Sequence, residues 1–466
     1  PHTTHTRHTT QTTTINKKPL PPLRPNLAIA LPMVVSQASE TIMLFADRLF
    51  LSRLGEAYIS GALSGGLTFF TVVSLFAATV GYVNAIAAQY YGAGRLERCA
   101  QTATQGFYAS LFLYPLLIPL MPLVRGFFVL VGHSEIQVLL EYTYFRILMY
   151  GALLVLIRNV FTGFFLGLGR SRIVMLANMA GMAVNIPATY ILIFGAFGVP
   201  AMGIQGAAIG TIIGSATIVA VFASVYFGPR IRGLYNTHRS FALIPSLLVR
   251  LLRFGLPAGI ETFLNVSAFN LFLQLMHSYG TEVAAAVTIT INYDMVAFIP
   301  MIGLSFAATA IIGQRVGARD YEGAVASTSL ILKIAYSYAA AMMLLFLFAT
   351  RPLITLFTSG IPNAGETIIP LGIVLLRLAA LYTLADATQL VFAGALRGAG
   401  DTRFVMKISV ALHWLFAAIA FVLIKILAVT PTLMWICFIT FVLCMGLVMF
   451  LRFYGGRWRS ISLIEV

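Results

Sequence analysis

The hydrophobic positions of this chain gather in long runs, which charged, glycine and proline residues interrupt. Each run has about twenty or more residues, the length that a helix needs to cross the hydrocarbon core of a bilayer. The strands of a membrane β-barrel would instead alternate apolar and polar positions in short segments. The pattern therefore predicts twelve transmembrane helices, over residues 27–51, 59–89, 101–125, 141–168, 173–197, 203–227, 250–279, 283–313, 324–349, 367–396, 404–427 and 432–454.

The composition also indicates an all-α polytopic membrane protein. The 466 residues are 59% hydrophobic and only 10% charged, and their mean hydropathy is +0.91. Soluble domains carry about 25% charged residues, so this chain has too few charges to cover a surface that faces water. The same values exclude an intrinsically disordered chain, a collagen and a small disulfide scaffold.

One polar break is longer than the others and divides the predicted helices into two sets of six. Residues 228–249 are interpreted as a cytoplasmic linker between an N-terminal lobe, 27–227, and a C-terminal lobe, 250–455. Residues 1–26 are rich in Thr, His and Pro and lack an apolar core, so we expect a disordered cytoplasmic tail and no cleavable signal peptide. Residues 456–466 are expected to form a second cytoplasmic tail.

The two halves repeat each other in sequence, in the same order and at a nearly constant offset. The matches are Leu31-Pro32 with Leu256-Pro257, Gly55 with Gly280, Gln89-x-x-Gly92-Ala93 with Gln314-x-x-Gly317-Ala318, and Gly169-x-x-Arg172-x-Val174-Met175 with Gly400-x-x-Arg403-x-Val405-Met406. Each half has an even number of predicted helices, so both halves enter the membrane from the same side. The repeat is therefore parallel, and a transport site is expected between the halves.

The formal net charge of +15 arises from an uneven placement of Lys and Arg. The termini and the even-numbered loops hold 21 of the 30 basic residues, whereas the odd-numbered loops and their edges hold five. An excess of Lys and Arg marks the cytoplasmic side of a membrane protein. Both termini are thus predicted to be cytoplasmic, in a cell inner membrane. The charge sets topology and gives no support for a nucleic-acid partner.

Several short motifs resemble those of one transporter family. They are Leu31-Pro32 with Ser36-Gln37 and Asp47, Arg53-Leu54-Gly55, the loops after Gln89 and Gln314, Asn185 before Ile193-Phe194-Gly195, Phe254-Gly255-Leu256-Pro257, and Ala393-Gly394-Ala395-Leu396-Arg397-Gly398. Together they resemble the MATE family of multidrug and toxic compound extrusion transporters, over about residues 27–455. The resemblance implies a secondary active antiporter that exports organic cations while Na⁺ or H⁺ enters.

The resemblance implies a cation site in the N-terminal lobe. Asp47 aligns with the family's first-helix aspartate, which lines this site, and Asn185 aligns with a fifth-helix asparagine. Some branches of the family carry an aspartate four residues later, where this chain has Thr189. Asp47, Asn185 and Thr189 are therefore candidate ligands of Na⁺, and the missing carboxylate leaves the choice between Na⁺ and H⁺ open. The alternative for Asp47 is an interfacial pair with Arg48.

A second set of candidate residues is expected in the C-terminal lobe. Asp386 aligns with a tenth-helix aspartate of one bacterial drug-efflux branch, and Gln389 lies one turn away on the same face. That branch has a seventh-helix glutamate where this chain has Asn265, one turn after Glu261, so Glu261 is the candidate for its role. By the repeat, Asn265 corresponds to Glu40 in the first half. For Glu261 and Glu40 the alternative is an internal ion pair.

Few of the fifteen acidic residues lie within the predicted spans, where an ionised carboxylate is costly. Burial favours the neutral form of an unpaired carboxyl, so such a group can carry a proton. The same group can pair with Na⁺ or with a cationic substrate. A carboxyl that holds either the ion or the substrate, but never both, is the simplest basis for antiport. Five acids within the spans are candidates: Glu40, Asp47, Glu261, Asp386 and Asp294, the last without a motif match.

Basic residues inside the predicted spans bear on the substrate. They are Arg146, Arg158, Lys333 and Arg377. We expect them to be structural partners of the acids, with Arg377 as the alternative partner of Asp386. If several of them instead line a central cleft, an anionic substrate becomes possible. A flippase for lipid-linked or polysaccharide substrates, with a similar two-lobed architecture, is therefore the alternative function.

Other functional classes lack their signatures in this sequence. The chain contains no His-Glu-x-x-His, no Gly-x-Ser-x-Gly and no phosphate-binding P-loop. Neither an enzyme nor a pump driven by ATP is thus expected, and no cofactor besides the coupling ion. A passive channel would differ because its flux cannot run against a substrate gradient. The expected partners are amphipathic, cationic small molecules and membrane lipid, and the chain is expected to be a monomer.

Overall fold

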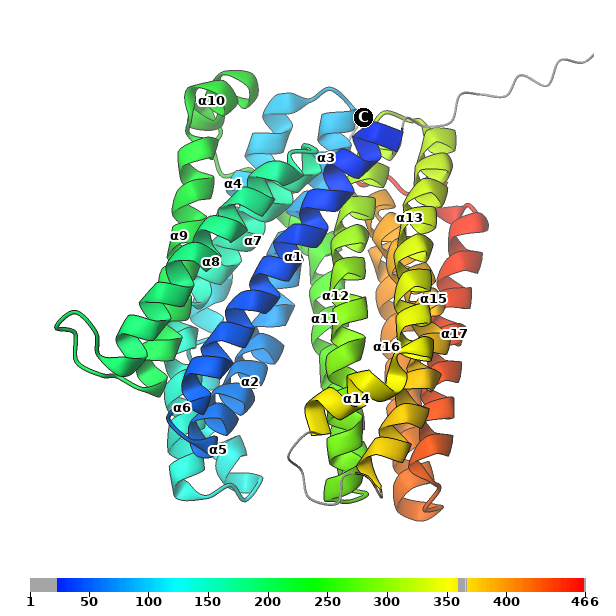
Figure 1. Ribbon diagram of the computed structural model, residues 1–466. Coiled ribbons are helices and arrows are strands. Elements are labelled where there is room, and N and C mark those ends of the chain that lie inside the picture. The colour runs from blue at the N-terminus through cyan, green and yellow to red at the C-terminus, as the bar shows by residue number, and fades with distance from the viewer. Residues whose placement is uncertain (1–22, 359–364, 366, 465–466) are drawn as a thin grey trace, which may run out of the picture.

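The computed structural model describes residues 23–358, 365 and 367–464, and every regular element in those ranges is a helix. Figure 1 shows two helical bundles side by side, the first formed by the N-terminal half of the chain and the second by the C-terminal half. Most of the predicted tail, 1–26, lies outside the described residues.

The first bundle, the N-terminal lobe, contains six spans, and three of them are broken into two helices. They are α1 (Leu23–Ser52); α2 (Glu56–Gly81) with α3 (Val83–Gly92); α4 (Leu96–Leu113) with the 3-10 turn Tyr114–Leu116 and α5 (Leu120–Leu130); α6 (Glu135–Tyr150) with α7 (Ala152–Gly167); α8 (Ser171–Phe194); and α9 (Ile204–Tyr226).

The second bundle, the C-terminal lobe, also contains six spans. They are α11 (Pro245–His277), α12 (Thr281–Gly317), α13 (Tyr321–Phe348) followed by the short α14 (Thr350–Thr358), α15 (Ile368–Ala399), α16 (Thr402–Phe421) followed by the π-helical turn Val422–Ile426, and α17 (Pro431–Tyr454). The segment predicted as a linker, 228–249, contains α10 (Pro229–Tyr235), the 3-10 turn Thr237–Arg239 and the first turn of α11. The C-terminal segment contains the 3-10 helix η4 (Arg457–Ser460).

Two N-terminal spans are sharply bent, which the hydrophobic pattern did not predict. α4 with its 3-10 turn meets α5 at 51° across the break 117–119, which contains Pro119, and α6 and α7 also meet at 51°, at Gly151. Proline lacks the N–H that a continuous helix needs, and glycine is a poor helix former. Apolar runs 101–125 and 141–168 are therefore bent helix pairs instead of single straight helices.

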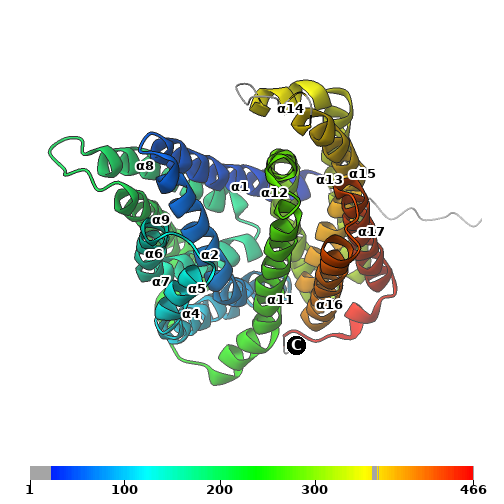
Figure 2. The same cartoon turned by 90° about the horizontal axis from the view of Figure 1, so that it is seen from below.

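Nine of the described helices are long and apolar enough to cross a membrane, and the two bent pairs raise this number to eleven. The twelfth span is α11, which has 33 residues but is more polar because it carries Glu261 and Asn265. Figure 2 shows α11 and α12 between the N-terminal lobe and helices α13–α17. The predicted all-α fold of two six-span lobes is confirmed.

Backbone geometry confirms the parallel repeat. Gly55 precedes α2 with φ 125°, and Gly280 precedes α12 with φ 124°. A side chain is strained at such a φ, so glycine is required at both positions. Gly169 and Gly400 likewise have positive φ values, 72° and 97°, in the turns that follow α7 and α15.

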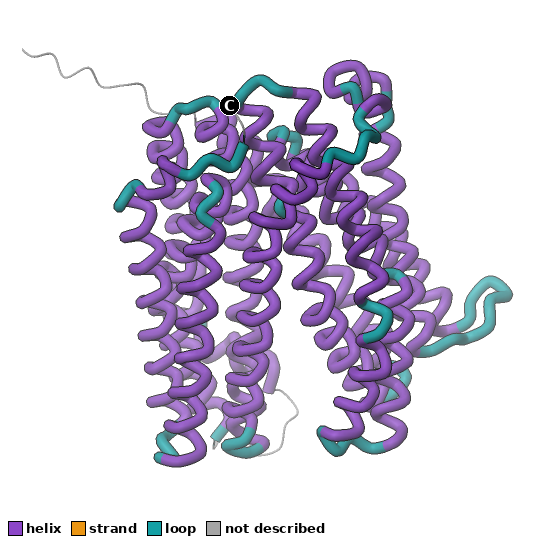
Figure 3. The backbone as a smooth tube through the Cα atoms, turned by 180° about the vertical axis from the view of Figure 1, so that it is seen from behind, coloured by secondary structure: helices purple, strands orange, loops and turns teal. Residues whose placement is uncertain are grey.

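Apolar packing differs between the two ends of the molecule. The largest hydrophobic core contains residues of both lobes, such as Tyr82, Ala85, Ala308 and Leu396. Two smaller cores belong to the C-terminal and the N-terminal lobe alone. Figures 1 and 3 show the lobes in contact near the end that carries α10 and the C terminus, and diverging toward the other end. We call these the joined end and the split end.

Candidate functional site

Asp47 is buried near the split end of α1, and it contacts α8 and α9. Its Oδ2 accepts a hydrogen bond from the Thr211 hydroxyl of α9 at 3.0 Å, and the Thr189 hydroxyl also contacts the carboxyl. Oδ1 has no hydrogen-bond partner among the described residues. Arg48 is exposed, and its charge acts on Asp47, but the two side chains form no ion pair in the described chain.

Asn185 and Thr189 lie one turn apart on α8, as predicted, and both are fully buried. The Asn185 side-chain amide donates to the Thr189 hydroxyl at 3.3 Å, while Asn185 Oδ1 has no partner within the described chain. α9 can approach because it presents glycines here. A Cβ atom at Gly210 would collide with Thr189, and one at Gly214 would press against Asn185.

The structure thus brings the three N-terminal candidates together and adds Thr211. We call Asp47, Asn185, Thr189 and Thr211 the N-lobe set. Two of its buried oxygens are unsatisfied, which costs free energy unless a ligand contacts them. Carboxylate, amide and hydroxyl oxygens suit a hard cation such as Na⁺, and the carboxyl can also take a proton. The sequence signal for Thr211 was its place between Gly210 and Gly214 in the glycine-rich α9.

Three buried groups meet in the C-terminal lobe, and we call them the C-lobe set. Asp386 and Tyr382 lie one turn apart on α15, and Asp294 lies on α12. The charges of the two carboxyls act on each other, and the Tyr382 side chain lies beside them. Neither acid forms an ion pair with a basic residue of the described chain. Arg377 is exposed and does not pair with Asp386.

The two carboxyls of the C-lobe set affect each other's charge. Two neighbouring buried carboxylates repel each other, so a proton or a cation bound at the pair stabilises it. The resemblance identified Asp386, whereas Asp294 had no motif and Tyr382 was missed. The four-residue spacing from Tyr382 to Asp386 was the available signal. Gln389 is half-buried on α15 and forms no hydrogen bond to either acid in the described part of the chain.

Glu261 does not join the C-lobe set. Its Oε1 lies 2.6 Å from Arg397 Nη2 in an ion pair, which is the internal pair considered above as its alternative. The Tyr82 hydroxyl of the N-terminal lobe donates to the Arg397 carbonyl at 2.7 Å, so this ion pair lies where the lobes meet. Asn265, one turn later, donates to the Ser409 hydroxyl at 2.9 Å.

Glu40 also has a basic partner. Its Oε1 lies 3.6 Å from Arg158 Nη2 and accepts a hydrogen bond from Asn178 at 3.3 Å. Arg158 is therefore a partner of an intramembrane acid, as expected. The same expectation is wrong for three other bases, which are exposed and have no acidic partner within the described residues: Arg146, Lys333 and Arg377.

At the joined end, the repeated glutamines hold the lobes together. Gln89 Nε2 donates to the Gly398 carbonyl at 2.9 Å, and Gln314 Nε2 donates to the Gly167 carbonyl at 2.8 Å. Both bonds cross between lobes, and the repeat relates one to the other. Gly92 packs against the Gln314 backbone and Gly317 against the Gln89 backbone, so closely that no side chain fits at either glycine. We call this arrangement the glutamine latch.

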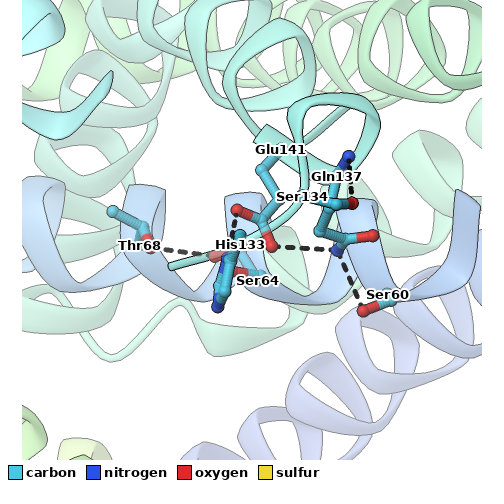
Figure 4. Close-up of polar contacts among 7 residues, drawn as sticks. All are labelled: Ser60, Ser64, Thr68, His133, Ser134, Gln137 and Glu141. Carbon is cyan, nitrogen blue, oxygen red and sulfur yellow. Dashed lines mark hydrogen bonds and ion pairs between the residues drawn. The ribbon is translucent and has the colours of Figure 1, made fainter. Parts of the chain in front are cut away.

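A further buried acid, Glu141 on α6, lies in a network that the sequence did not indicate. Figure 4 shows its carboxyl between the His133 ring and the Gln137 amide, each at 2.9 Å. Gln137 also contacts the Ser60 hydroxyl of α2 at 2.9 Å. Both carboxyl oxygens have partners, so this network joins α2 to α6 and leaves no free oxygen for a ligand.

An apolar cavity of about 400 Å³ lies between the lobes. It opens between α2 and α5 of the N-terminal lobe and α11 of the C-terminal lobe. Its lining is entirely hydrophobic: Val72, Leu75, Phe76, Leu120, Leu123, Val124, Phe127 and Phe263.

The sequence matches a family and curated relatives over most of its length. The MatE family model matches residues 32–191 and 257–423. A probable multidrug resistance protein NorM of Neisseria meningitidis is 26% identical, over 83% of this chain and 84% of the relative. The multidrug resistance protein MdtK of Edwardsiella ictaluri is 25% identical, over 93% of this chain and 94% of the relative.

Solved structures share the fold. A multidrug resistance transporter of the MATE family in an outward-facing conformation superposes with a TM-score of 0.83 at 21% identity, over 94% of this chain and 97% of that one. A MOP superfamily transporter from Pyrococcus furiosus, whose binding pocket is described as having reverse polarity, superposes with a TM-score of 0.86 at 21% identity, with the same coverage.

Proposed function

Since the chain belongs to the MatE family of multidrug efflux transporters, we propose that it is a secondary active antiporter. It exports amphipathic organic cations in exchange for Na⁺ or H⁺. Members of this family are transporters and not enzymes.

One observation carries this proposal: each lobe buries carboxyls that have no basic partner in the described chain. These are Asp47 in the N-lobe set and the pair Asp294 and Asp386 in the C-lobe set. Unpaired charge inside a bilayer is costly and is a mark of ion and substrate pathways. A bound cation or proton removes the cost, so these carboxyls favour binding one or the other.

The two ends of the molecule provide the basis for alternating access. The glutamine latch and the shared core close the joined end, while separate cores let the lobes diverge at the split end. In the proposed cycle the latch breaks, the split end closes and the joined end opens. The cavity between the lobes and the two buried sets then exchange ion and substrate with the other side of the membrane.

Orientation follows from the charges. Arg95, Arg98, Arg315 and Arg319 belong to the loops at the joined end, and the positive-inside rule assigns such loops to the cytoplasm. The split end then faces outward, in a cell inner membrane with both termini cytoplasmic. We propose that the described conformation is outward-facing.

The cavity between the lobes supports the substrate class. Its eight side chains are aliphatic or phenyl groups, which bind the apolar part of a molecule without demanding a fixed shape. The cationic part would pair with a carboxyl of the N-lobe or C-lobe set. Because ion and substrate compete for the same carboxyls, entry of one drives release of the other, and the membrane potential adds about 2.3 kcal/mol per charge per 100 mV.

The decisive experiment is efflux of a cationic dye from proteoliposomes under separately imposed Na⁺ and H⁺ gradients. The proposal expects one gradient, and not the other, to drive dye uphill, with a protonophore or a Na⁺ ionophore stopping it. Efflux that never exceeds equilibration would identify a channel and overturn the proposal. Protein without a gradient, and empty liposomes, are the controls.

A flippase for lipid-linked or polysaccharide substrates is the second candidate. It is favoured by the three exposed intramembrane bases that lack an acidic partner in the described chain: Arg146, Lys333 and Arg377. A triple Gln variant separates the two functions. The antiporter proposal expects dye export to survive these changes, whereas export of an anionic lipid-linked reporter by the wild type, and its loss in the variant, would favour the flippase.

A further inference from the structure

A second cavity lies away from the proposed transport site, between the cytoplasm-facing ends of α16 and α17. It has a volume of about 270 Å³ and is lined by Phe404, Val448, Leu451, Arg452, Gly455 and Arg457. Leu447 and Leu451 of α17 are exposed, so this face of the helix meets lipid tails in a membrane. The cavity therefore has apolar walls toward the bilayer and guanidinium groups at the level where the spans end.

One arginine of the cavity is held in place by its own partners. Arg452 Nε lies 2.7 Å from Asp401 Oδ2, and its guanidinium lies 4.2 Å from the centre of the Phe404 ring. Asp401 balances the charge of Arg452, so this side chain forms a rigid wall and supplies further donors without adding net charge.

The other arginine has no acid to balance it within the described residues. Arg457 is exposed and forms no ion pair within the described residues, yet its backbone is firmly anchored. The next residue, Trp458, is fully buried, stacks on Phe453 with the ring centres 5.2 Å apart, and donates to the Phe453 carbonyl at 2.7 Å. η4 thus presents an uncompensated guanidinium over the cavity at a defined position.

The surrounding charge has the same sign. Arg403 and Lys407 are exposed in the first turns of α16, and Arg459 is exposed in η4, whereas Asp401 is already paired. Basic pockets between transmembrane helices on the cytoplasmic side bind anionic lipid headgroups. We propose that this cavity binds an anionic phospholipid of the cytoplasmic leaflet, with its phosphate on Arg457 and Arg452 and its glycerol and upper chains on Phe404, Val448 and Leu451.

The apolar walls argue for a lipid in preference to free phosphate. Inorganic phosphate would use the guanidinium groups alone and would leave the hydrophobic lining in contact with water. A diacyl phospholipid covers both parts at once, and it reaches the cavity by lateral diffusion along the exposed face of α17. The inference does not depend on the proposed antiport, because none of these residues belongs to the N-lobe or C-lobe set. Its assignment to the cytoplasmic leaflet rests on the orientation given under the proposed function.

Native mass spectrometry of the full chain in a neutral detergent tests the site. Phosphatidylglycerol is expected to bind more tightly than phosphatidylcholine, and millimolar inorganic phosphate is expected to leave the lipid bound. Arg457→Gln should weaken phosphatidylglycerol binding about fivefold, the change expected for one arginine near an anionic headgroup. Arg459→Gln is the matched control: it removes the same charge two residues away, at a side chain that stacks on Trp458 outside the cavity.

A second pair of variants tests the cavity without changing charge. Val448→Trp fills the space and should weaken binding as much as Arg457→Gln, whereas Leu447→Trp adds the same bulk to the exposed neighbour and should not. Equal losses in Arg457→Gln and Arg459→Gln would show diffuse attraction and overturn the proposal. So would displacement by inorganic phosphate, or equal affinity for the two lipids.

Discussion

The two lobes share a framework but bury different chemistry in it. The N-lobe set has one carboxyl, Asp47, surrounded by an amide and two hydroxyls. The C-lobe set has two carboxyls, Asp294 and Asp386, beside one phenol. The glutamine latch, in contrast, is nearly the same when viewed from either lobe, with bonds of 2.9 and 2.8 Å.

The contrast between the two buried sets and the latch shows which parts of the repeat must be alike in both lobes. The residues that form the interface between the lobes must be alike in the two halves, because each lobe is the other's partner. Sites inside one lobe are free to diverge. We infer that the C-lobe pair, which cannot hold two uncompensated charges, binds the coupling ion most tightly, and that the N-lobe set exchanges ion and substrate more readily.

Asp386→Asn is expected to have the largest effect. It removes a carboxyl from the site that we propose holds the ion, and coupling free energies of about 1–3 kcal/mol correspond to about 5–150-fold in affinity. We therefore expect coupled dye export to fall to background while membrane insertion is unchanged. Export in proteoliposomes, normalised to inserted protein, measures this. The matched control is Glu282→Gln, which neutralises an exposed acid in the first turn of α12.

Asp47→Asn should come next. It removes the one carboxyl of the N-lobe set, so a cationic substrate loses its counter-charge and export again falls by at least about tenfold. Glu135→Gln, an exposed acid in the first turn of α6, is the control. Near-normal export in both Asp47→Asn and Asp386→Asn would refute the assignment of these acids.

Asp294→Asn should have an intermediate effect on export, one that distinguishes the C-lobe set from the N-lobe set. The remaining Asp386 no longer shares its ion with a second carboxyl, so it holds the ion less firmly. We expect the concentration of coupling ion needed for half-maximal export to rise about tenfold, equivalent to about 1.4 kcal/mol, with a smaller change in maximal rate. An unchanged ion requirement would mean that Asp294 is structural and that the C-lobe set acts through one acid.

Gln89→Ala and Gln314→Ala test whether the two halves of the glutamine latch contribute equally. Each removes one inter-lobe hydrogen bond of about 1 kcal/mol, so each should shift the outward-facing population about fivefold and by the same amount. Spin labels on the loops after α1 and α11, with distances measured by electron–electron resonance, report the shift. Gln101→Ala, which alters an exposed contact with Arg98, is the control. A shift from one glutamine only would show that the latch is not symmetric in energy.

Glu261→Gln should change export least. Its carboxylate is paired with Arg397, and hydrogen bonds between charged groups contribute about 1.5–3 kcal/mol, so thermal stability in detergent should fall while export stays within about twofold. The contrast with Asp386→Asn sharpens the distinction between paired and unpaired acids. Export lost at unchanged stability would place Glu261 in the transport site.

Much of the fold was predictable because it depends on local patterns. Long apolar runs require helices in a bilayer, and matching glycines such as Gly55 and Gly280 revealed the repeat. The bends at Pro119 and Gly151 were harder, since proline and glycine are also tolerated in straight spans. Among the sites, Asp47, Asn185 and Thr189 were found by resemblance, and their proximity follows from the packing of α1, α8 and α9.

The chain's pattern of apolar and charged residues was enough to determine the helices, the two halves and their parallel relation, because each depends on the contact of a short segment with lipid or water. Only the tertiary structure decided which acids are paired. Glu261 and Asp386 are both acids within predicted spans. Arg397 forms an ion pair with Glu261, whereas no base of the described chain pairs with Asp386. The Glu261–Arg397 and Glu40–Arg158 pairs join residues more than a hundred positions apart, which no local pattern records.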